Sequence, residues 1–321
     1  MGRESFAIGQ VRVRPGSRKD VELPITRLVT GGDVSLPVQI VHGKYDGPTI
    51  WVSAAIHGEE VMGVEVVRRL LATLNPKHLH GTLMAVPVVN VLGFMTGDRY
   101  LPDRRDLNRA FPGSPRGSLA SRIAHLFMEE VVSKCELGID LHTAADRRAN
   151  LPQLRGDLDD PRTYGLAKVF GAPVMLHAKL RDGSLRQAAT EAGSMVLLYE
   201  SGEAMRFDEL SIGTGVAGIR RVMAHLGMIE EVVEQPAAPT LESRESNWIR
   251  ARGTGIFQLE CELGDMVESG RRLGRTSDTF GRGGRLVRAD RDGIVIGLTR
   301  APIVNAGDGL VHVAQITSTD G

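Results

Sequence analysis

The chain has 321 residues, of which 42% are apolar and 24% are charged, proportions that are ordinary for a soluble globular protein. Its 39 basic residues balance 39 acidic residues, which argues against nucleic acid as a partner but says nothing about where charge gathers locally. With only two cysteines, the composition excludes a disulfide framework and a cysteine-rich metal site.

The amino-terminal ten residues carry early charges and no apolar run, so they are not typical of a secretory signal. No stretch of the sequence is long and apolar enough to span a bilayer. We therefore expect a cytoplasmic protein without a membrane partner. A homo-oligomer is expected as well, because symmetric assemblies are common among soluble proteins.

The first regular elements predict a strand–turn–helix unit. Strands are expected over 36–41 and 49–56, where Val and Ile dominate and glycines separate the two runs. Apolar residues then recur at helical spacing over 61–74. His57 stands where the second strand gives way to this helix, and Glu60 follows within one turn.

The same alternation continues to residue 226. Further strands are expected over 81–89, 137–141, 172–176 and 195–199, and helices over 118–133, 162–170, 185–192 and 212–226, with an irregular stretch over 97–117. Alternating strands and helices predict an α/β fold with a largely parallel or mixed sheet. Ligands of such sheets gather at the carboxyl ends of strands, and His142 and Glu200 directly follow two of the expected strands.

Beyond Pro236–Pro239 the helical pattern ends. Frequent glycines separate short runs rich in Val, Ile and Leu, a pattern that predicts a compact β-barrel or sandwich of about 80 residues. We therefore expect one domain over 1–238 and a second over 239–321.

One group of residues has the chemistry of a metal site. Catalytic zinc takes three His or carboxylate ligands and keeps one position for water. His57 and Glu60 have the H-x-x-E spacing that lets two ligands converge from one turn, and His142 is the natural third. Asp140 points to the same face of its strand as His142 and could accept a hydrogen bond from a ligand imidazole. The H-x-x-E pair alone and His142 alone are more often surface or structural residues. The hypothesis of a metal site therefore rests on their position at strand ends.

A second cluster, Asp106–Gly113, reads D-L-N-R-A-F-P-G and follows Arg99, Arg104 and Arg105 in the irregular stretch. A guanidinium can hold a carboxylate in a fork, and an Asn side chain supplies both a donor and an acceptor. The alternative is a charged surface loop in which Asp106 pairs with a neighbouring arginine.

Four segments together resemble the succinylglutamate desuccinylase and aspartoacylase family, a branch of the zinc carboxypeptidase-like amidohydrolases. In order they are Ala55–Glu60, Asp106–Gly113, Asp140–Thr143 and Tyr199–Gly202. The resemblance implies a zinc carboxypeptidase-like mixed central sheet flanked by helices. It also implies a small carboxyl-terminal β-barrel similar to biotinyl and lipoyl carrier domains. Its turn over 288–293 has no lysine, so we expect a packing or gating role and no attached cofactor.

The resemblance also implies a role for each candidate residue. His57, Glu60 and His142 would hold one zinc ion per chain, Asn108 and Arg109 would bind a substrate carboxylate, and Glu200 would act as general base and then acid. Arg99 would stabilise the oxyanion, with Arg104 and Arg105 as alternatives. Glu191 and Glu203 lie near enough in sequence to compete with Glu200.

The implied activity is that of a zinc-dependent amidohydrolase, which removes the acyl group from an N-acyl amino acid or a related small carboxylate by metal-activated water. A zinc exopeptidase acting on short peptides and a catalytically silent binding protein with the same fold are the alternatives. The acyl group itself has no readable code in the segments expected to line the pocket, 147–155 and 179–186.

Overall fold

The computed structural model describes residues 3–145, 147–230 and 233–317. Up to residue 225 its strands are β1 (Phe6–Ile8), β2 (Val11–Val13), β3 (Ser17–Arg27), β4 (Asp33–His42), β5 (Tyr45–Ala54), β6 (His80–Val86), β7 (Leu137–Ala144), β8 (Arg148–Gly156), β9 (Val174–His177) and β10 (Met195–Glu203). The helices are α1 (Met62–Thr73), α2 (Val91–Thr96), α3 (Leu119–Glu130), α4 (Pro161–Phe170), α5 (Leu185–Glu191) and α6 (Glu209–His225), with 3₁₀ turns η1 (Leu107–Arg109) and η2 (Val132–Lys134).

The later elements are all strands. They are β11 (Leu241–Arg250), β12 (Gly255–Leu259), β13 (Met266–Val267), β14 (Arg272–Ser277), β15 (Arg285–Arg288), β16 (Gly293–Thr299), β17 (Ile303–Val304) and β18 (Gly309–Ile316). A mixed sheet runs through the molecule in the order β13-β16-β18-β11-β9-β8-β10-β7-β5-β6-β4-β3. The expected mixed α/β class is therefore confirmed.

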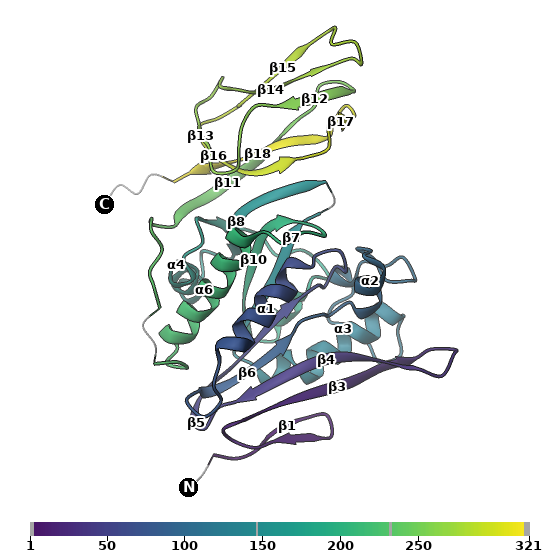
Figure 1. Cartoon of the computed structure of the whole chain (residues 1–321), viewed down its shortest axis with the longest axis vertical. Helices are drawn as coiled ribbons and strands as arrows, with labels where there is room; N and C mark the ends of the chain where they lie inside the picture. Colours follow the sequence, from purple (N-terminus) through teal and green to yellow (C-terminus); the bar gives the residue numbers. More distant parts are fainter. Residues whose placement is uncertain (1–2, 146, 231–232, 318–321) are drawn as a thin grey trace.

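Helices cover both faces of the part of this sheet that is formed by strands before residue 225 (Figure 1). The apolar sides of α1, α4 and α6 pack into one core, and those of α3 and α5 pack into the other. The predicted start of α3 is confirmed, because the Ser118 hydroxyl accepts a hydrogen bond from the Ser121 amide there. α6 begins at Glu209, three residues before the predicted start. Within the described residues, no helix has the length and apolar character needed to cross a membrane.

Three neighbouring strands bring the candidate residues to one edge of the sheet. β7 pairs in parallel with both β5 and β10, and Glu200 lies directly beside His142 in the register. Parallel strands end at the same edge, so the loop that follows β5 and carries His57 reaches that edge too.

The carboxyl-terminal strands form two layers. β13, β16, β18 and β11 belong to the large sheet, and β15, β14, β12 and β17 form a second sheet of four strands. An apolar core that includes Phe257, Leu273 and Val311 fills the space between the layers. We call this unit the β unit; its likeness to carrier domains stays a prediction.

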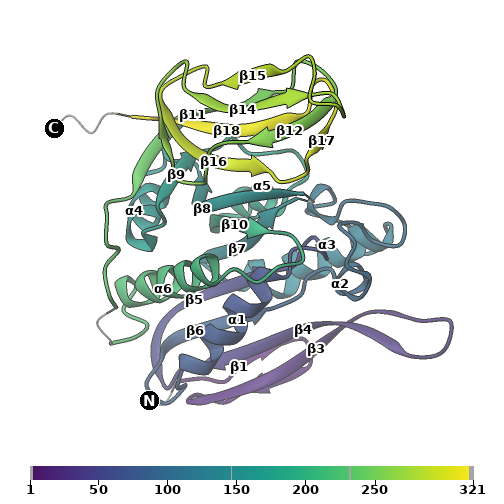
Figure 2. The same cartoon turned by 45° about the horizontal axis from the view of Figure 1, so that its top comes forward.

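The β unit is joined to the rest of the sheet by strand pairing. β11 runs parallel to β9, and β16 runs antiparallel to β8, with Gly297 opposite Asn150. Figure 2 shows β8 directly beneath the strands of the β unit. The domain boundary at 238/239 falls just before β11 and stays a prediction. The parts of both predicted domains at 1–2, 146, 231–232 and 318–321 lie outside the described residues.

Gly138 in β7 lies against the buried indole of Trp51: an added Cβ would lie 1.9 Å from Cζ2 of that ring. We expect Gly138→Ala to lower the free energy of unfolding by about 1–3 kcal/mol, because overpacking forces the ring and its strand to shift. Gly165→Ala in α4 is the matched control, since nothing lies within 4 Å of its added Cβ. Urea denaturation should show a loss for the first variant and none for the second; equal stabilities would contradict this packing.

Candidate metal centre and its pocket

The loop after β5 folds tightly, which brings His57 and Glu60 together. The backbone amide of Glu60 donates to the carbonyl of His57 at 3.1 Å, so both side chains leave one turn. Between them, Gly58 lies so close to the backbone of Gly93 that an added Cβ would come within 2.0 Å of its carbonyl carbon. Only glycine fits this contact, so the H-G-E-E sequence is also a packing signal.

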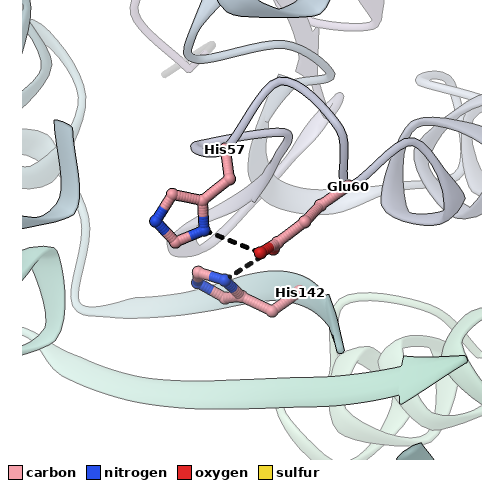
Figure 3. Close-up of side chains that lie close together, drawn as sticks. All are labelled: His57, Glu60 and His142. Atoms are coloured by element: carbon pink, nitrogen blue, oxygen red, sulfur yellow. Dashed lines mark hydrogen bonds and ion pairs between the residues drawn. The ribbon is translucent and has the colours of Figure 1, made fainter. Parts of the chain in front are cut away.

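The side chains of His57, Glu60 and His142 converge at the end of this turn (Figure 3). Nδ1 of His57 lies 2.7 Å from one Glu60 oxygen, and Nδ1 of His142 lies 2.9 Å from the other. All three side chains are almost fully buried. Their potential ligand atoms lie within 4.8 Å of one another, so the group could hold a metal ion.

The outward nitrogens of both imidazoles face carboxylates. Nε2 of His142 lies 2.8 Å from Asp140, which in turn accepts a hydrogen bond from the Ser53 hydroxyl at 2.6 Å. Nε2 of His57 lies 3.1 Å from Asp106. Zinc-binding histidines are typically oriented by such carboxylates, so both imidazoles fit the role of a ligand bound through Nδ1.

Opposite charges hold this buried group together. Burial alone would raise the pKa of Glu60, but the charges of His57 and His142 outweigh it and hold that pKa well below its usual range. Burial likewise opposes a charged His142, yet Asp140 and Glu60 raise its pKa well above the ordinary value. The surrounding carboxylates thus favour positive charge at this point, as a divalent cation would require.

Glu200 lies on β10 where the pairing with β7 and β8 becomes irregular, between Glu200 and Gly202–Glu203. Such irregularities re-aim side chains next to active sites. One oxygen of Glu200 accepts a hydrogen bond from Nδ2 of Asn150 at 3.2 Å, and the other lies 3.3 Å from the guanidinium of Arg155. Both partners come from β8, so this strand orients the carboxylate.

Of the three candidate arginines, Arg99 is the one that faces the candidate metal ligands. Its guanidinium lies 3.1 Å from Asp106 and 3.6 Å from Glu60, and its carbonyl accepts a hydrogen bond from Asn90. Arg104 and Arg105 are 79% and 65% exposed and pair with aspartates of their own loop. The geometry therefore favours Arg99 over both.

Asn108 and Arg109 lie on η1, and the Asp106 side chain caps its start by accepting a hydrogen bond from the Asn108 amide. The Asn108 side-chain oxygen accepts a hydrogen bond from the Leu185 amide at 2.9 Å, which ties η1 to the start of α5. The backbone of Arg109 lies against Gly183, where an added Cβ would be 2.7 Å from the Arg109 carbonyl oxygen. These contacts hold the loop before α5 beside η1.

All eight candidate residues line one pocket of about 280 Å³, namely His57, Glu60, Arg99, Asn108, Arg109, Asp140, His142 and Glu200. The sequence did not single out the other polar lining residues, which include Arg148, Asn150, Arg155, Lys179, Arg181, Arg186 and Trp248. Most of them come from the two segments expected to line the pocket, but nothing in those segments revealed which side chains turn inward. Asp106 was also missed as a partner of His57.

His312 of β18 packs against Trp248, which lines this pocket. Its ring stacks on Trp248 at 4.8 Å, and burial, with Arg155 and Arg148 nearby, lowers its pKa to about 3. The folded protein therefore keeps this imidazole neutral at a pH where the unfolded chain protonates it. As pH falls from about 6.5 towards 3, the unfolded chain binds the extra proton and the free energy of unfolding falls.

We expect the wild type to lose about 1–2 kcal/mol more than His312→Gln when the pH is lowered from 7 to 5, because only the wild type carries this imidazole. Urea denaturation of both proteins at each pH measures the difference, in which the effects of all other titrating groups cancel. A difference between wild type and variant that is independent of pH would contradict a buried neutral His312.

Comparison with known proteins shows which family and which enzymes this chain resembles. Residues 46–226 match the succinylglutamate desuccinylase/aspartoacylase catalytic domain. An N-alpha-acetyl-L-2,4-diaminobutyric acid deacetylase from Halomonas elongata is 28% identical over 315 residues, which cover 94% of this chain and 92% of that enzyme. A succinylglutamate desuccinylase from Photorhabdus laumondii is 34% identical over 125 residues, or 33% of this chain and 37% of that enzyme.

Solved structures agree over nearly the whole chain. A succinylglutamate desuccinylase/aspartoacylase from Rhodobacter sphaeroides superposes with a TM-score of 0.84 and 26% identity, covering 98% of this chain and 97% of that one. The product-bound ectoine utilization protein EutE (DoeB) from Ruegeria pomeroyi gives a TM-score of 0.82 and 25% identity, covering 93% and 94%. Both similarities extend over the β unit as well as the catalytic part.

Proposed function

Because the chain belongs to the succinylglutamate desuccinylase/aspartoacylase family, we propose that it is a zinc-dependent hydrolase that removes the acyl group from an N-acyl amino acid. The observation that carries the proposal is the convergence of His57, Glu60 and His142 in the pocket that also holds Glu200. The activities named for the relatives, deacetylation and desuccinylation, belong to this class of reaction.

His57, Glu60 and His142 are the proposed ligands of one zinc ion. Two imidazole nitrogens and one carboxylate are a usual ligand set of catalytic zinc. Zinc bound there supplies a Lewis acid that acidifies water and polarises a carbonyl group. Asp140 and Asp106 keep the two imidazoles in orientation, and Ser53 does the same for Asp140.

Glu200 is the proposed general base. It takes a proton from the attacking water and returns that proton to the amide nitrogen as the amine leaves. Asn150 and Arg155 keep both of its oxygens in place before substrate arrives. Arg99 donates hydrogen bonds to the carbonyl oxygen as negative charge develops on it.

Arg109 is the proposed anchor for the substrate's α-carboxylate. We expect Arg109→Ala to raise KM by about 10- to 100-fold with a smaller change in kcat, because a charge-assisted hydrogen bond to the ground state is lost. Arg116→Ala, in an exposed turn outside the pocket, is the matched control. Steady-state kinetics on any accepted substrate decide the point, and an unchanged KM would remove the anchoring role.

Amine release by the zinc-loaded protein tests the whole proposal. The panel contains N-acetyl and N-succinyl amino acids, N-acetyl-2,4-diaminobutyrate, N-succinylglutamate and several dipeptides. Turnover of acyl amino acids that a chelator abolishes and zinc restores is the expected result. Turnover of dipeptides alone would favour an exopeptidase, and no release with zinc bound would favour a binding protein.

A further inference from the structure

Glu200 stands between two residues that are both hydrogen-bonded to α6. The Tyr199 hydroxyl donates to the backbone carbonyl of Ser211 at 2.8 Å, and the Ser201 hydroxyl donates to the hydroxyl of Ser211 at 2.6 Å. All three side chains are fully buried. Successive side chains of a strand point to opposite faces, so these contacts lie on the face away from the Glu200 side chain. One residue of α6 therefore holds β10 on both sides of the proposed general base.

Ser211 is itself fixed by the residue that caps α6. Its hydroxyl donates to one oxygen of Asp208 at 2.5 Å, and the other oxygen accepts a hydrogen bond from the Leu210 amide at 3.2 Å. A carboxylate only accepts hydrogen bonds, and a hydroxyl has a single proton to donate. Ser211 therefore gives its proton to Asp208 and is left to accept from Ser201. The chain of hydrogen bonds runs in one direction, from β10 to the start of α6.

These contacts fall where β10 changes its pairing. The register with β7 shifts between Glu200 and Glu203, and Gly202 has a φ of +72°. An added Cβ on Gly202 would lie 3.2 Å from Oγ of Ser211, so the backbone of the bulge lies against this hydroxyl. A glycine restrains the backbone least. The direction of the Glu200 side chain therefore depends on what holds Ser201.

β8 and α6 act on different parts of Glu200. Asn150 and Arg155 of β8 contact its carboxylate, whereas Ser211 holds the strand that carries it. A general base must lie within about 2.6–3.2 Å of the group whose proton it takes. A misplacement of about 1 Å, caused by a change far from the chemistry, can lower the rate by about 100-fold. The backbone contacts are therefore as relevant to catalysis as the contacts of the carboxylate.

We propose that Ser211 is a positioning residue for the hydrolysis: through Ser201 it holds the bulge of β10, so that the Glu200 carboxylate stays aimed into the pocket. This inference rests on the proposed function, in which Glu200 is the general base. The Ser211 hydroxyl is buried behind the strand and donates to Asp208, so it contacts no substrate. Its loss should therefore lower kcat and leave KM and the zinc affinity unchanged.

Ser211→Ala removes the hydroxyl and keeps the backbone carbonyl that Tyr199 uses. We expect kcat to fall by about 10- to 100-fold, with KM and zinc affinity within about twofold of wild type. Ser201→Ala should lose kcat to a similar degree. It keeps the bond between Ser211 and Asp208, so it tests the same contact if the first variant does not fold. Ser118→Ala, which removes the cap of α3 in the other core, is the matched control and should keep the wild-type kcat.

Double variants show whether the hydroxyl acts through Glu200. The losses of Ser201→Ala and Ser211→Ala should not add, because both changes break the same contact. In the Glu200→Gln background, adding Ser211→Ala should change kcat by less than about twofold, since the base that it positions is gone. A merely structural effect would lower kcat in both backgrounds. That result, or a wild-type kcat in both single variants, would make the inference wrong while the hydrolase stands.

Hydrogen exchange provides a readout without turnover. Peptides that cover 199–203 should exchange about 10-fold faster in Ser211→Ala than in wild type, because the bulge opens more often. Peptides that cover 57–60 and 140–143 should exchange at the wild-type rate. Equal exchange over 199–203 in both proteins would overturn the positioning role independently of activity. If no member of the earlier panel is hydrolysed, the proposed function fails and this inference falls with it.

Discussion

Replacing Glu200 with glutamine is expected to lower kcat by about 100- to 10,000-fold while the zinc content stays at the wild-type level. The amide keeps the size of the side chain and can still contact Asn150, but it cannot accept a proton from water. Because Glu200 does not supply any of the converging ligand atoms, the variant should still bind the metal. Single-turnover kinetics together with metal analysis of the purified variant measure both quantities.

Two nearby glutamates provide matched controls. Glu203 lies 3.7 Å from Arg206, and Glu191 accepts a hydrogen bond from Gln187 within α5; neither lines the pocket. Glu203→Gln and Glu191→Gln should therefore keep kcat within about twofold of wild type. Full activity in Glu200→Gln, or a large loss in either control, would assign the general base to another residue.

The convergence of His57, Glu60 and His142 could be predicted from the sequence because its geometry is largely local. His57 and Glu60 leave one turn, and Asp140 and His142 lie on the same face of one strand, so spacing alone fixes their relation. Joining the two pairs required only that β5 and β7 end at the same edge of a sheet. The sequence predicted strands over 49–56 and 137–141, where β5 and β7 lie.

The wall of the pocket could not be predicted in the same way. β8, which carries Arg148, Asn150 and Arg155, reads R-A-N-L-P-Q-L-R-G, with neither alternation nor a Val/Ile run. Pro152 argues against a central strand, since it cannot donate to a neighbour. The structure tolerates it because the pairing with β10 is irregular between Glu200 and Gly202, opposite this proline.

Contacts between distant segments account for the other residues that were missed. Asp106 pairs with His57 across 49 positions of sequence. Trp248 lines the pocket from β11, which pairs with β18; β18 pairs with β16, and β16 pairs with β8. No local pattern reports such a relation. Likewise, the sequence did not distinguish Arg99 from Arg104 and Arg105. Contacts with Asn90 and Asp106 hold Arg99 in its position.

The removal of His142 should produce the largest loss of metal. We expect His142→Ala to bind zinc more than about 100-fold more weakly than wild type and to lose measurable turnover, since loss of an outer carboxylate alone costs about 10- to 100-fold. Asp140→Asn should show that smaller loss. Competition with a zinc-binding dye measures the affinity of each protein.

A second group of side chains makes this experiment discriminating. Asp157, Asp159 and His177 also bring their potential ligand atoms within 4.8 Å of one another, but both aspartates are exposed and Asp159 pairs with Arg244 at 2.6 Å. His177→Ala should therefore leave both zinc affinity and turnover unchanged. If His177→Ala lost the metal and His142→Ala kept it, the zinc would lie at the surface group. The buried group would then be held by its ion pairs alone, those of Glu60 with the two imidazoles and of the imidazoles with Asp106 and Asp140.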